Sequence, residues 1–353
     1  MVRINKPILV VSAVAIFSVI TAPQASQSRG PNGPEPEFTG QLSVMTYNVH
    51  GLPWPLAWGR KGAFGAIAEQ LAQLRREGRQ PHVIALQEAF TQDAKALGEV
   101  AGYHYAAEGP ASDAINAAQP DAGARAFHAE SSWLRGETQG KALGSGLQIF
   151  SDYPIVRVRK LAFPDFACAG YDCLANKGAL MVCIKPPGQS DCVEVVTTHL
   201  NSRRASGASS ERSLGAYRLQ VRYLSDFIRQ QHDPKRALIV VGDFNVGKVA
   251  DRRDALWQHA QADWGVDGRV NDALGEAVRL GKPLSHDAIL SRRKAKDWQF
   301  YGSGSSSRLE LVGIETPFGR KPDGTMLSDH VGYTAAFSLT PRGRGEPDEG
   351  RSQ

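Results

Sequence analysis

The sequence predicts an α/β fold in which two packed β-sheets are covered by helices. Short apolar runs of strand length alternate with longer amphipathic stretches, and the strand-like runs outnumber the helical ones. The chain has 353 residues and is 42% hydrophobic and 22% charged, which is the composition of an ordinary globular protein. This composition excludes a mainly disordered or fibrous chain, and the pattern favours one large domain.

Residues 1–28 have the pattern of a secretory signal peptide. Arg3 and Lys6 precede an uncharged apolar run over residues 8–20, and small residues follow it. The run is shorter than the roughly 20 residues that a membrane-spanning helix needs. We therefore expect a secreted or periplasmic protein. An uncleaved amino-terminal anchor is the alternative, because no clean A-x-A cleavage site is present.

Pro/Gly-rich and polar segments bound the expected domain. Residues 29–40 include the sequence GPNGPEPEFTG, which predicts a Pro/Gly-rich linker. Residues 341–353 are polar and poor in apolar side chains, which predicts a disordered tail. The folded domain is therefore expected over residues 41–340.

Within that domain, strands are expected where a short apolar run is bounded by polar or turn residues. The expected strands are residues 42–49, 82–87, 146–150, 179–184, 193–198, 237–241, 288–290 and 332–337. Apolar residues at helical spacing predict one helix around 64–74 and another around 214–228, and a third is expected over 91–100. Many strands and few helices are typical of two packed sheets with helices outside.

The four cysteines lie between positions 168 and 192. An exported chain meets an oxidising compartment, where neighbouring cysteines usually form disulfides. The spacing favours Cys168 with Cys173 and Cys183 with Cys192, the second pair closing a hairpin over residues 186–188. Zinc binding is a weaker alternative, because the spacings are not C-x2-C and no histidine lies among the cysteines. Four free thiols are the remaining alternative.

Polar side chains end or follow several of the expected strands. They are Asn48, Glu88, His199, Asp243, Asn245, Asp329 and His330. Each of them alone is most often a turn former or a surface residue. If the strand ends converge, carboxylates that suit a hard divalent cation meet histidines and amides that can stabilise charge on phosphoryl oxygens. Together these residues predict metal-assisted hydrolysis of a phosphate ester.

The order of these motifs resembles the endonuclease/exonuclease/phosphatase superfamily of metal-dependent phosphoesterases. An Asn in the first strand is followed by LQE, TH, GDFN and SDH at later strand ends, over residues 42–337. The resemblance implies a four-layered α/β sandwich of two packed mixed sheets flanked by helices. It also implies Mg²⁺, or another hard divalent cation such as Mn²⁺ or Ca²⁺, as the cofactor of a phosphoric diester hydrolase.

The same resemblance implies the metal and water-activating groups. Glu88 would be the main metal ligand, and Asn48 would help to bind the metal or the scissile phosphate. Asp329 would lie beside the metal and the phosphate. Asp243 would orient and deprotonate the attacking water, and Asn245 would hold that geometry.

The two histidines would contact the phosphate oxygens. By resemblance, His199 and His330 would stabilise the charge on the non-bridging or leaving oxygens. Asp287, in LSHDAILS, would hydrogen-bond His330 and keep it charged and oriented. A turn residue at the start of a strand is the alternative for Asp287.

The middle of the chain resembles the secreted bacterial sphingomyelinases and their neutral animal relatives. The motifs are GSGLQIFSDYPI over residues 144–155 and CLANKGALMVCI over residues 173–184. In the second motif Asn176 and Lys177 would bind the substrate, whereas an ordinary exposed strand-start lysine is the alternative for Lys177. The chain between Asn245 and Asp287 is short for the long aromatic hairpin of these enzymes.

Trp54 and Trp58 are expected to replace that hairpin as an interfacial patch, with packing in a loop or core as the alternative. The expected substrate is then a phosphodiester in a lipid head group at a membrane surface, and no obligate protein partner is evident.

A secreted deoxyribonuclease-like endonuclease is the alternative function. Basic clusters could grip a nucleic-acid backbone, and they comprise Arg203, Arg204, Arg212, Arg292, Arg293, Lys294 and Lys296. The net charge argues against a nuclease. Two of the 41 Lys and Arg residues lie in the expected leader, so 39 basic residues face 36 Asp and Glu residues and the mature net charge is +3. A binding protein that has lost the chemistry is disfavoured, because the matching carboxylates and histidines are all present.

Overall fold

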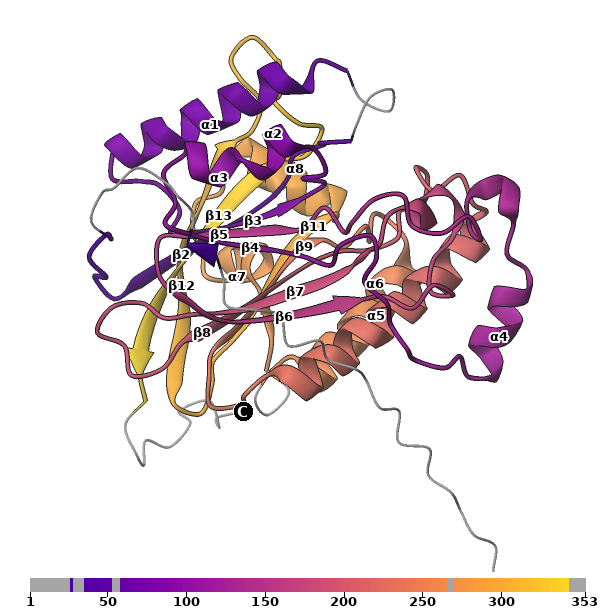
Figure 1. The fold of residues 1–353 in the computed structure, drawn as a ribbon. Coiled ribbons are helices and arrows are strands. Elements are labelled where there is room, and N and C mark those ends of the chain that lie inside the picture. The colour runs from indigo at the N-terminus through magenta and orange to yellow at the C-terminus, as the bar shows by residue number, and fades with distance from the viewer. Residues whose placement is uncertain (1–25, 28–34, 53–57, 266–268, 343–353) are drawn as a thin grey trace, which may run out of the picture.

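The structure is a computed structural model that describes residues 26–27, 35–52, 58–265 and 269–342. Nearly all of the expected leader, half of the expected linker, Trp54 and nearly all of the expected tail lie outside these residues. In the described part, two mixed β-sheets pack face to face, and helices cover their outer faces (Figure 1). The expected four-layered α/β sandwich is confirmed.

The first sheet, as far as the structure describes it, has seven strands in the order β1-β4-β5-β3-β2-β13-β12. Their bounds are β1 (Ser26–Gln27), β2 (Gln41–Asn48), β3 (Val83–Gln87), β4 (Tyr105–Glu108), β5 (Gln148–Ser151), β12 (Ser307–Phe318) and β13 (Gly332–Pro341). β2 and β3 are parallel, whereas their outer neighbours β13 and β5 run antiparallel to them. The carboxyl ends of β2 and β3 therefore lie side by side.

The second sheet has six strands among the described residues, in the order β10-β11-β9-β8-β7-β6. Their bounds are β6 (Ile155–Ala162), β7 (Gly178–Ile184), β8 (Val193–His199), β9 (Leu238–Asp243), β10 (Asn271–Asp272) and β11 (Asp297–Gly302). β8 and β9 are parallel, and β11 runs antiparallel to β9. The last residues of β8 and β9 thus meet the first residue of β11 at one edge.

Alternation of apolar side chains along the central strands explains why both faces of each sheet are covered. In β2, Leu42 and Val44 belong to the core between the sheets, whereas Met45 and Tyr47 face a separate apolar cluster under a helix. Successive side chains of a strand point to opposite faces, so one short run can supply two cores. A strand buried on both faces has few tolerable polar positions except at its ends, which is where the site residues lie.

Helices cover the two sheets on opposite sides of the molecule (Figure 1). α1 (Arg60–Arg76) packs on the first sheet through Phe64, Ile67, Ala68, Leu71 and Leu74, the apolar stripe that predicted it. α5 (Ser210–Gln231) and α6 (Ala250–Asp263) cover the second sheet. The remaining helices are α2 (Gln92–Lys95), α3 (Leu97–Val100), α4 (Ala122–Ala129), η1 (Trp133–Arg135), η2 (Gly170–Leu174), α7 (Ala273–Arg279) and α8 (His286–Lys294).

The structure corrects one predicted element and two predicted boundaries in particular. Residues 288–290 are not a strand but the middle of α8, because the Ser285 hydroxyl accepts a hydrogen bond from the Ala288 amide and caps a helix there. The helix expected over 91–100 is two short helices that meet at Ala96. Pro341 belongs to β13 and not to the tail, and the Arg342 amide donates to the Ser306 carbonyl.

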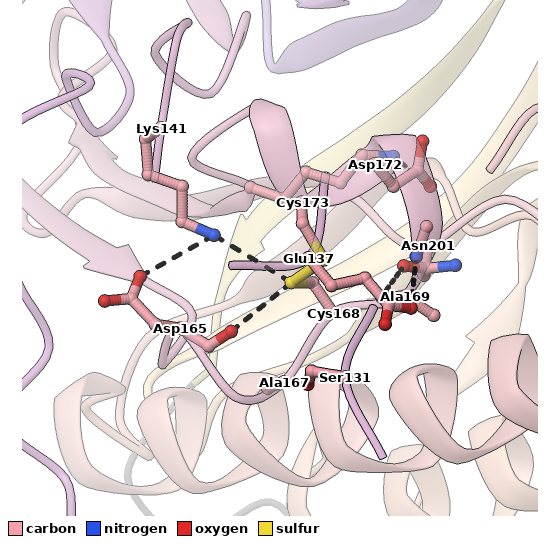
Figure 2. The surroundings of a disulfide bond; sticks show 12 residues. Ser131, Glu137, Lys141, Asp165, Ala167, Cys168, Ala169, Asp172, Cys173 and Asn201 are labelled. Carbon is pink, nitrogen blue, oxygen red and sulfur yellow. Dashed lines mark hydrogen bonds and ion pairs between the residues drawn. A yellow bond between two sulfur atoms is a disulfide. The ribbon is translucent and has the colours of Figure 1, made fainter. Parts of the chain in front are cut away.

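Both expected disulfides are confirmed. Cys168 pairs with Cys173 and Cys183 with Cys192, with Cα atoms 5.2 and 5.5 Å apart. Cys183 lies in β7 and Cys192 directly precedes β8, so the second bridge closes the β7–β8 hairpin. Figure 2 shows the first bridge in a dense loop network that includes Lys141, Asp165 and Asn201. Among the described residues, no helix has the length and hydropathy needed to cross a membrane.

Removing the Cys168–Cys173 bridge is expected to lower the free energy of unfolding by about 2 kcal/mol, because closing so short a loop removes little entropy from the unfolded chain. Urea unfolding of the Cys168→Ala/Cys173→Ala variant measures this loss, and Cys183→Ala/Cys192→Ala gives the matched value for the hairpin bridge. Four free thiols in the wild-type protein purified without a reductant, detected by mass spectrometry, would contradict the disulfide assignment.

Candidate active site

The site lies where the ends of strands from both sheets meet. β2 ends at Asn48, and Glu88 directly follows β3 in the first sheet. In the second sheet, strand pairing places His199 beside Asp243 and Asp243 beside Asp297. The expected convergence of strand ends is therefore present, and one residue in it, Asp297, was not expected.

Asn48 connects the two sheets at this point. Its side-chain amide donates to Glu88 Oε1 at 2.9 Å and to Asp243 Oδ2 at 3.1 Å, and its side-chain oxygen accepts from the His50 amide at 3.0 Å. Asn48 is almost fully buried. One neutral amide thus holds two carboxylates of like charge close together.

Glu88 carries the clearest sign of a ligand-binding group. Its backbone has φ 57°, a left-handed conformation that is uncommon outside glycine. The Oε2 atom is buried and has no hydrogen-bond partner among the described residues. Burial raises the pKa of Glu88, and the hydrogen bond from Asn48 opposes that rise. An unpartnered buried carboxylate oxygen needs a donor or a cation.

Backbone geometry at the site is unusual in several places. In the described part of the chain, the non-glycine residues with positive φ are His50, Glu88, Asn245 and Ala295. The first three belong to the site, in keeping with the tendency of such conformations to cluster where function requires them. Gly242 precedes Asp243 with φ 148°, and a Cβ atom there would lie 2.1 Å from the Thr198 carbonyl oxygen.

Asp243 lies at the centre of the site. Its Oδ2 is 3.6 Å from Nε2 of His199 and 3.6 Å from Nε2 of His330. Its Oδ1 accepts from the Asn245 amide at 2.9 Å, and the Asn245 side chain donates to the Leu200 carbonyl at 3.0 Å. Asn245 therefore fixes the turn that presents Asp243.

His330 is held by Asp297 and not by Asp287. Its Nδ1 is 2.8 and 2.9 Å from the two carboxylate oxygens of Asp297. Burial acts to lower the pKa of His330, but the carboxylates of Asp297 and Asp243 together raise it to about 9. His330 is therefore an imidazolium at neutral pH, with Nε2 directed toward Asp243 and Lys296.

The expected hydrogen bond between Asp287 and His330 is absent. Asp287 lies in the first turn of α8, and its carboxylate accepts a hydrogen bond from the Arg320 amide at 2.9 Å. The error follows from reading residues 288–290 as a strand, which placed Asp287 at a strand start. Asp297 occupies that kind of position, as the first residue of β11.

Asp297→Asn is expected to lower kcat by about 10- to 100-fold, because the positioning carboxylate of a catalytic histidine contributes on that scale. Asp287→Asn is the matched control and should keep native kcat. Steady-state kinetics on a soluble aryl phosphodiester, together with the pH profile of kcat, measure both. The reverse ranking of the two variants would restore the original assignment.

His199 has the opposite charge state to His330. Burial and the nearby Lys177 ammonium lower the pKa of His199 to about 3. Its Nε2 is 4.0 Å from Glu88 Oε1, and its Nδ1 is buried without a hydrogen-bond partner among the described residues. The site thus pairs one neutral with one charged imidazole on either side of Asp243.

Lys177 is buried, contrary to the reading as an exposed strand-start lysine. Its ammonium donates to the Leu200 carbonyl at 3.0 Å and lies 3.1 Å from Asp172 Oδ2. Asp172 precedes Cys173 and also accepts from the Ser202 amide. Lys177 therefore lies close enough to His199 to affect its pKa, and Asp172 is its counter-ion.

Asn176 and Asp329 both contact other residues of the chain. The Asn176 side chain donates to the carbonyls of Ala111 and Ala114 and so holds a loop. Asp329 is half exposed and lies 3.0 Å from His50 Nδ1. Although burial opposes the change, the hydrogen bond from His50 and the charge of His330 hold the pKa of Asp329 well below its usual range.

The donor atoms fit a hard divalent cation. Glu88, His199 and Asp243 each offer one ligand atom, and these atoms lie within 4.8 Å of one another. The unpartnered oxygen of Glu88 and the absence of thiolate at this position suit Mg²⁺-type chemistry better than a structural zinc site. Glu88 and Asn48 would hold such an ion, with Asp243 alongside.

Sequence reasoning missed Asp297, His50, Lys296 as a site residue and Asp172. Asp297 stands at the start of the run DWQFYG, and a polar residue at a strand end was the signal that identified the other site residues. Asp172 belongs to none of the motifs in the sequence. It reaches Lys177 only because of the way η2 folds.

The chain is similar to a known protein family and to several characterised proteins. Residues 45–330 match the model of the Endonuclease/Exonuclease/phosphatase family. A sphingomyelinase of Mycobacterium tuberculosis is 25% identical over 322 residues, covering 87% of this chain and 54% of that protein. The chain therefore spans about half the length of the curated relatives it matches.

Solved structures share the fold. A variant of beta toxin from Staphylococcus aureus, solved with bound magnesium ions, has a TM-score of 0.55 at 20% identity and covers 84% of this chain and 99% of its own. Sphingomyelinase C from Streptomyces griseocarneus has a TM-score of 0.54 at 20% identity, with the same coverage of 84% and 99%.

Proposed function

This chain belongs to the endonuclease/exonuclease/phosphatase family, and on that premise we propose that it is a secreted, Mg²⁺-dependent phosphodiesterase that hydrolyses the head-group phosphodiester of a lipid. The observation that carries the proposal is the convergence of Glu88, Asn48, Asp243, His199 and His330 from two sheets onto one point. Carboxylate, amide and imidazole groups in contact are the set that hydrolysis of a phosphate ester by activated water requires.

Each residue has a distinct part in the proposed reaction. Asp243 accepts the proton of the attacking water, since it is the central carboxylate and its other oxygen is fixed by the Asn245 amide. The His330 imidazolium, oriented by Asp297, stabilises the negative charge that develops on the phosphoryl oxygens. When bound by Glu88 and Asn48, a divalent cation supplies further charge stabilisation.

Lipid is the favoured substrate class for three reasons. The sphingomyelinase relatives match 87% of this chain, and the first basic cluster is weaker than the sequence suggested. Arg212 of that cluster is engaged with Glu137 at 2.7 Å and lies over the Phe127 ring. Trp58 is 75% exposed, as an interfacial aromatic residue would be, whereas Trp54 lies outside the described residues.

Export is supported by the disulfides and by the sequence of the leader. Two bridges form between neighbouring cysteines, and such bridges persist in oxidising compartments. The leader itself lies outside the described residues except for Ser26 and Gln27, which pair with β4.

One comparative assay tests the proposed function. The purified chain with Mg²⁺ is offered sphingomyelin vesicles, phosphatidylcholine vesicles, supercoiled DNA and a soluble aryl phosphodiester. We expect release of the phosphorylated head group from sphingomyelin and turnover of the aryl diester. Efficient nicking of DNA with sphingomyelin left intact would replace the proposal by the nuclease alternative.

A further inference from the structure

We propose that a basic cleft beside the active site binds the phosphate-bearing head groups of an anionic lipid surface. This inference rests on the proposed function, because it assigns the surface on which the enzyme would work. The basic cleft is the hollow between the loop 246–249 and the facing parts of α6, α7, α8 and the start of β11. Its main polar and aromatic lining is Lys248, Trp257, Asp272, Arg292, Arg293 and Trp298.

The basic cleft is continuous with the catalytic segment of the chain. One of its lining residues is Val246, which directly follows Asn245 in the sequence. The Phe244 amide donates to the Lys296 carbonyl at 2.7 Å, and the Gly247 amide donates to the Ala295 carbonyl at 2.9 Å. These bonds join the loop after β9 to the end of α8. A molecule in the basic cleft therefore lies next to the turn that presents Asp243.

Three cations in the basic cleft form no ion pair among the residues that the structure describes, although the charge of Arg292 acts on Asp272 from a longer distance. Lys248, Arg292 and Arg293 are exposed and make no ion pair there. The other two cations of the lining, Arg253 and Arg279, are paired on the surface with Asp254 and Glu276. Unpaired cations that line one hollow produce a positive potential that attracts phosphate.

Two tryptophans form a fixed aromatic wall of the basic cleft. The rings of Trp257 and Trp298 meet edge to face with centroids 6.1 Å apart, and both pack on Phe300. Trp298 Nε1 donates to the Ala295 carbonyl at 3.1 Å, which fixes the indole. Half-buried indoles beside basic groups suit the boundary between lipid head groups and acyl chains, where one end of the ring is apolar and the other polar.

Asp272 gives the basic cleft a second polar feature. Its Oδ2 accepts from the Gly275 amide at 2.8 Å and caps α7, whereas its Oδ1 is buried without a hydrogen-bond partner among the described residues. Asp272 Oδ1 is thus a buried acceptor that needs a hydrogen-bond donor from a ligand or from water. Lipid head groups that carry a primary ammonium or a hydroxyl group next to the phosphate supply a hydrogen-bond donor for Asp272 and an anion for the cations, whereas the quaternary ammonium of phosphatidylcholine offers no donor.

The test is binding of the full chain to vesicles, measured by co-sedimentation. The vesicles contain phosphatidylcholine alone or with phosphatidylserine, and EDTA replaces Mg²⁺, so no lipid is turned over. Lys248→Ala/Arg292→Ala/Arg293→Ala is expected to bind the phosphatidylserine vesicles roughly 100-fold more weakly, because a basic residue at an anionic surface contributes about 1 kcal/mol. Binding to pure phosphatidylcholine and turnover of a soluble aryl phosphodiester should be unchanged.

A matched triple variant separates the basic cleft from general charge. Arg125→Ala/Arg218→Ala/Lys235→Ala removes two arginines and one lysine that are also exposed, on α4, on α5 and after α5. This control should bind like the wild type. Equal losses in both triple variants would overturn the proposal, since charge alone would then explain the binding.

Two further arms identify the ligand. Glycerophosphoserine that displaces the protein from vesicles at matching head-group concentration would overturn the lipid assignment in favour of soluble phosphate esters. Duplex DNA binding that is lost in the cleft variant, with vesicle binding retained, would overturn it in favour of nucleic acid. Vesicle binding is measured without turnover. Failure to hydrolyse sphingomyelin would therefore refute the proposed function, while the binding assay would still test the basic cleft.

Discussion

His330→Ala is expected to lower kcat by about 10²- to 10⁴-fold and to change KM far less, the scale for removing one positioned catalytic group. The imidazolium is 4% exposed, is fixed by both oxygens of Asp297, and directs Nε2 to within 3.6 Å of Asp243. Its charge acts on the transition state and not on the bound ground state. Steady-state kinetics on a soluble aryl phosphodiester measure the effect without interfacial binding.

His232→Ala is the matched control for that variant. His232 is also a buried histidine on a carboxylate, with Nδ1 2.6 Å from Glu194 Oε2, but it lies near the start of β8, at the end of the strand opposite the site. We expect His232→Ala to lower stability and leave kcat near native. If folded His330→Ala also keeps near-native kcat, His330 is a structural residue.

The elements that the sequence predicted well are those buried on a regular face. The five apolar residues at helical spacing in α1 are its buried residues, and the apolar runs of β2, β3, β7, β8 and β9 form the strand cores. A segment whose side chains all contact one core must repeat with the period of its backbone. Periodicity therefore identified the central strands and, through their ends, most of the site.

The missed elements lack that signal for physical reasons. β11 buries Asp297 and Gln299 on the face that meets the site and the first sheet, so the run DWQFYG is not continuously apolar. α6 buries Arg252, whose guanidinium donates to the carbonyls of Asn201, Asn245 and Ser213. Polar side chains that are satisfied by tertiary hydrogen bonds read as surface residues in a sequence.

The identity of the partner of His330 depends on strand register. Asp297 reaches the histidine because it pairs with Asp243 across β9 and β11, and that pairing joins segments 54 residues apart in the sequence numbering. Hydrophobic pattern restricts a strand to one face, but it does not say which residue of a distant strand lies opposite. Asp287 and Asp297 were therefore distinguishable only in the fold.

Glu88→Gln is expected to raise the divalent-cation concentration needed for half-maximal activity by about 100-fold, and exhaustive chelation of the wild type should abolish turnover. The substitution removes the charge of the one buried carboxylate at the site that has an unpartnered oxygen among the described residues. Asn48 can still donate to the amide oxygen, so the fold should survive. Mg²⁺ titration by calorimetry measures the loss of affinity independently of turnover.

Glu194→Gln is the matched control for the metal site. Glu194 is more deeply buried than Glu88, but its carboxylate is satisfied by Arg157, Arg236 and His232 near the start of β8. The control should reduce stability, because it breaks a buried ion-pair cluster, and leave the Mg²⁺ requirement as in the wild type. Full activity of the wild type after exhaustive chelation would rule out a metal at Glu88, and the unpartnered oxygen would then have to be satisfied by a hydrogen-bond donor from water or substrate.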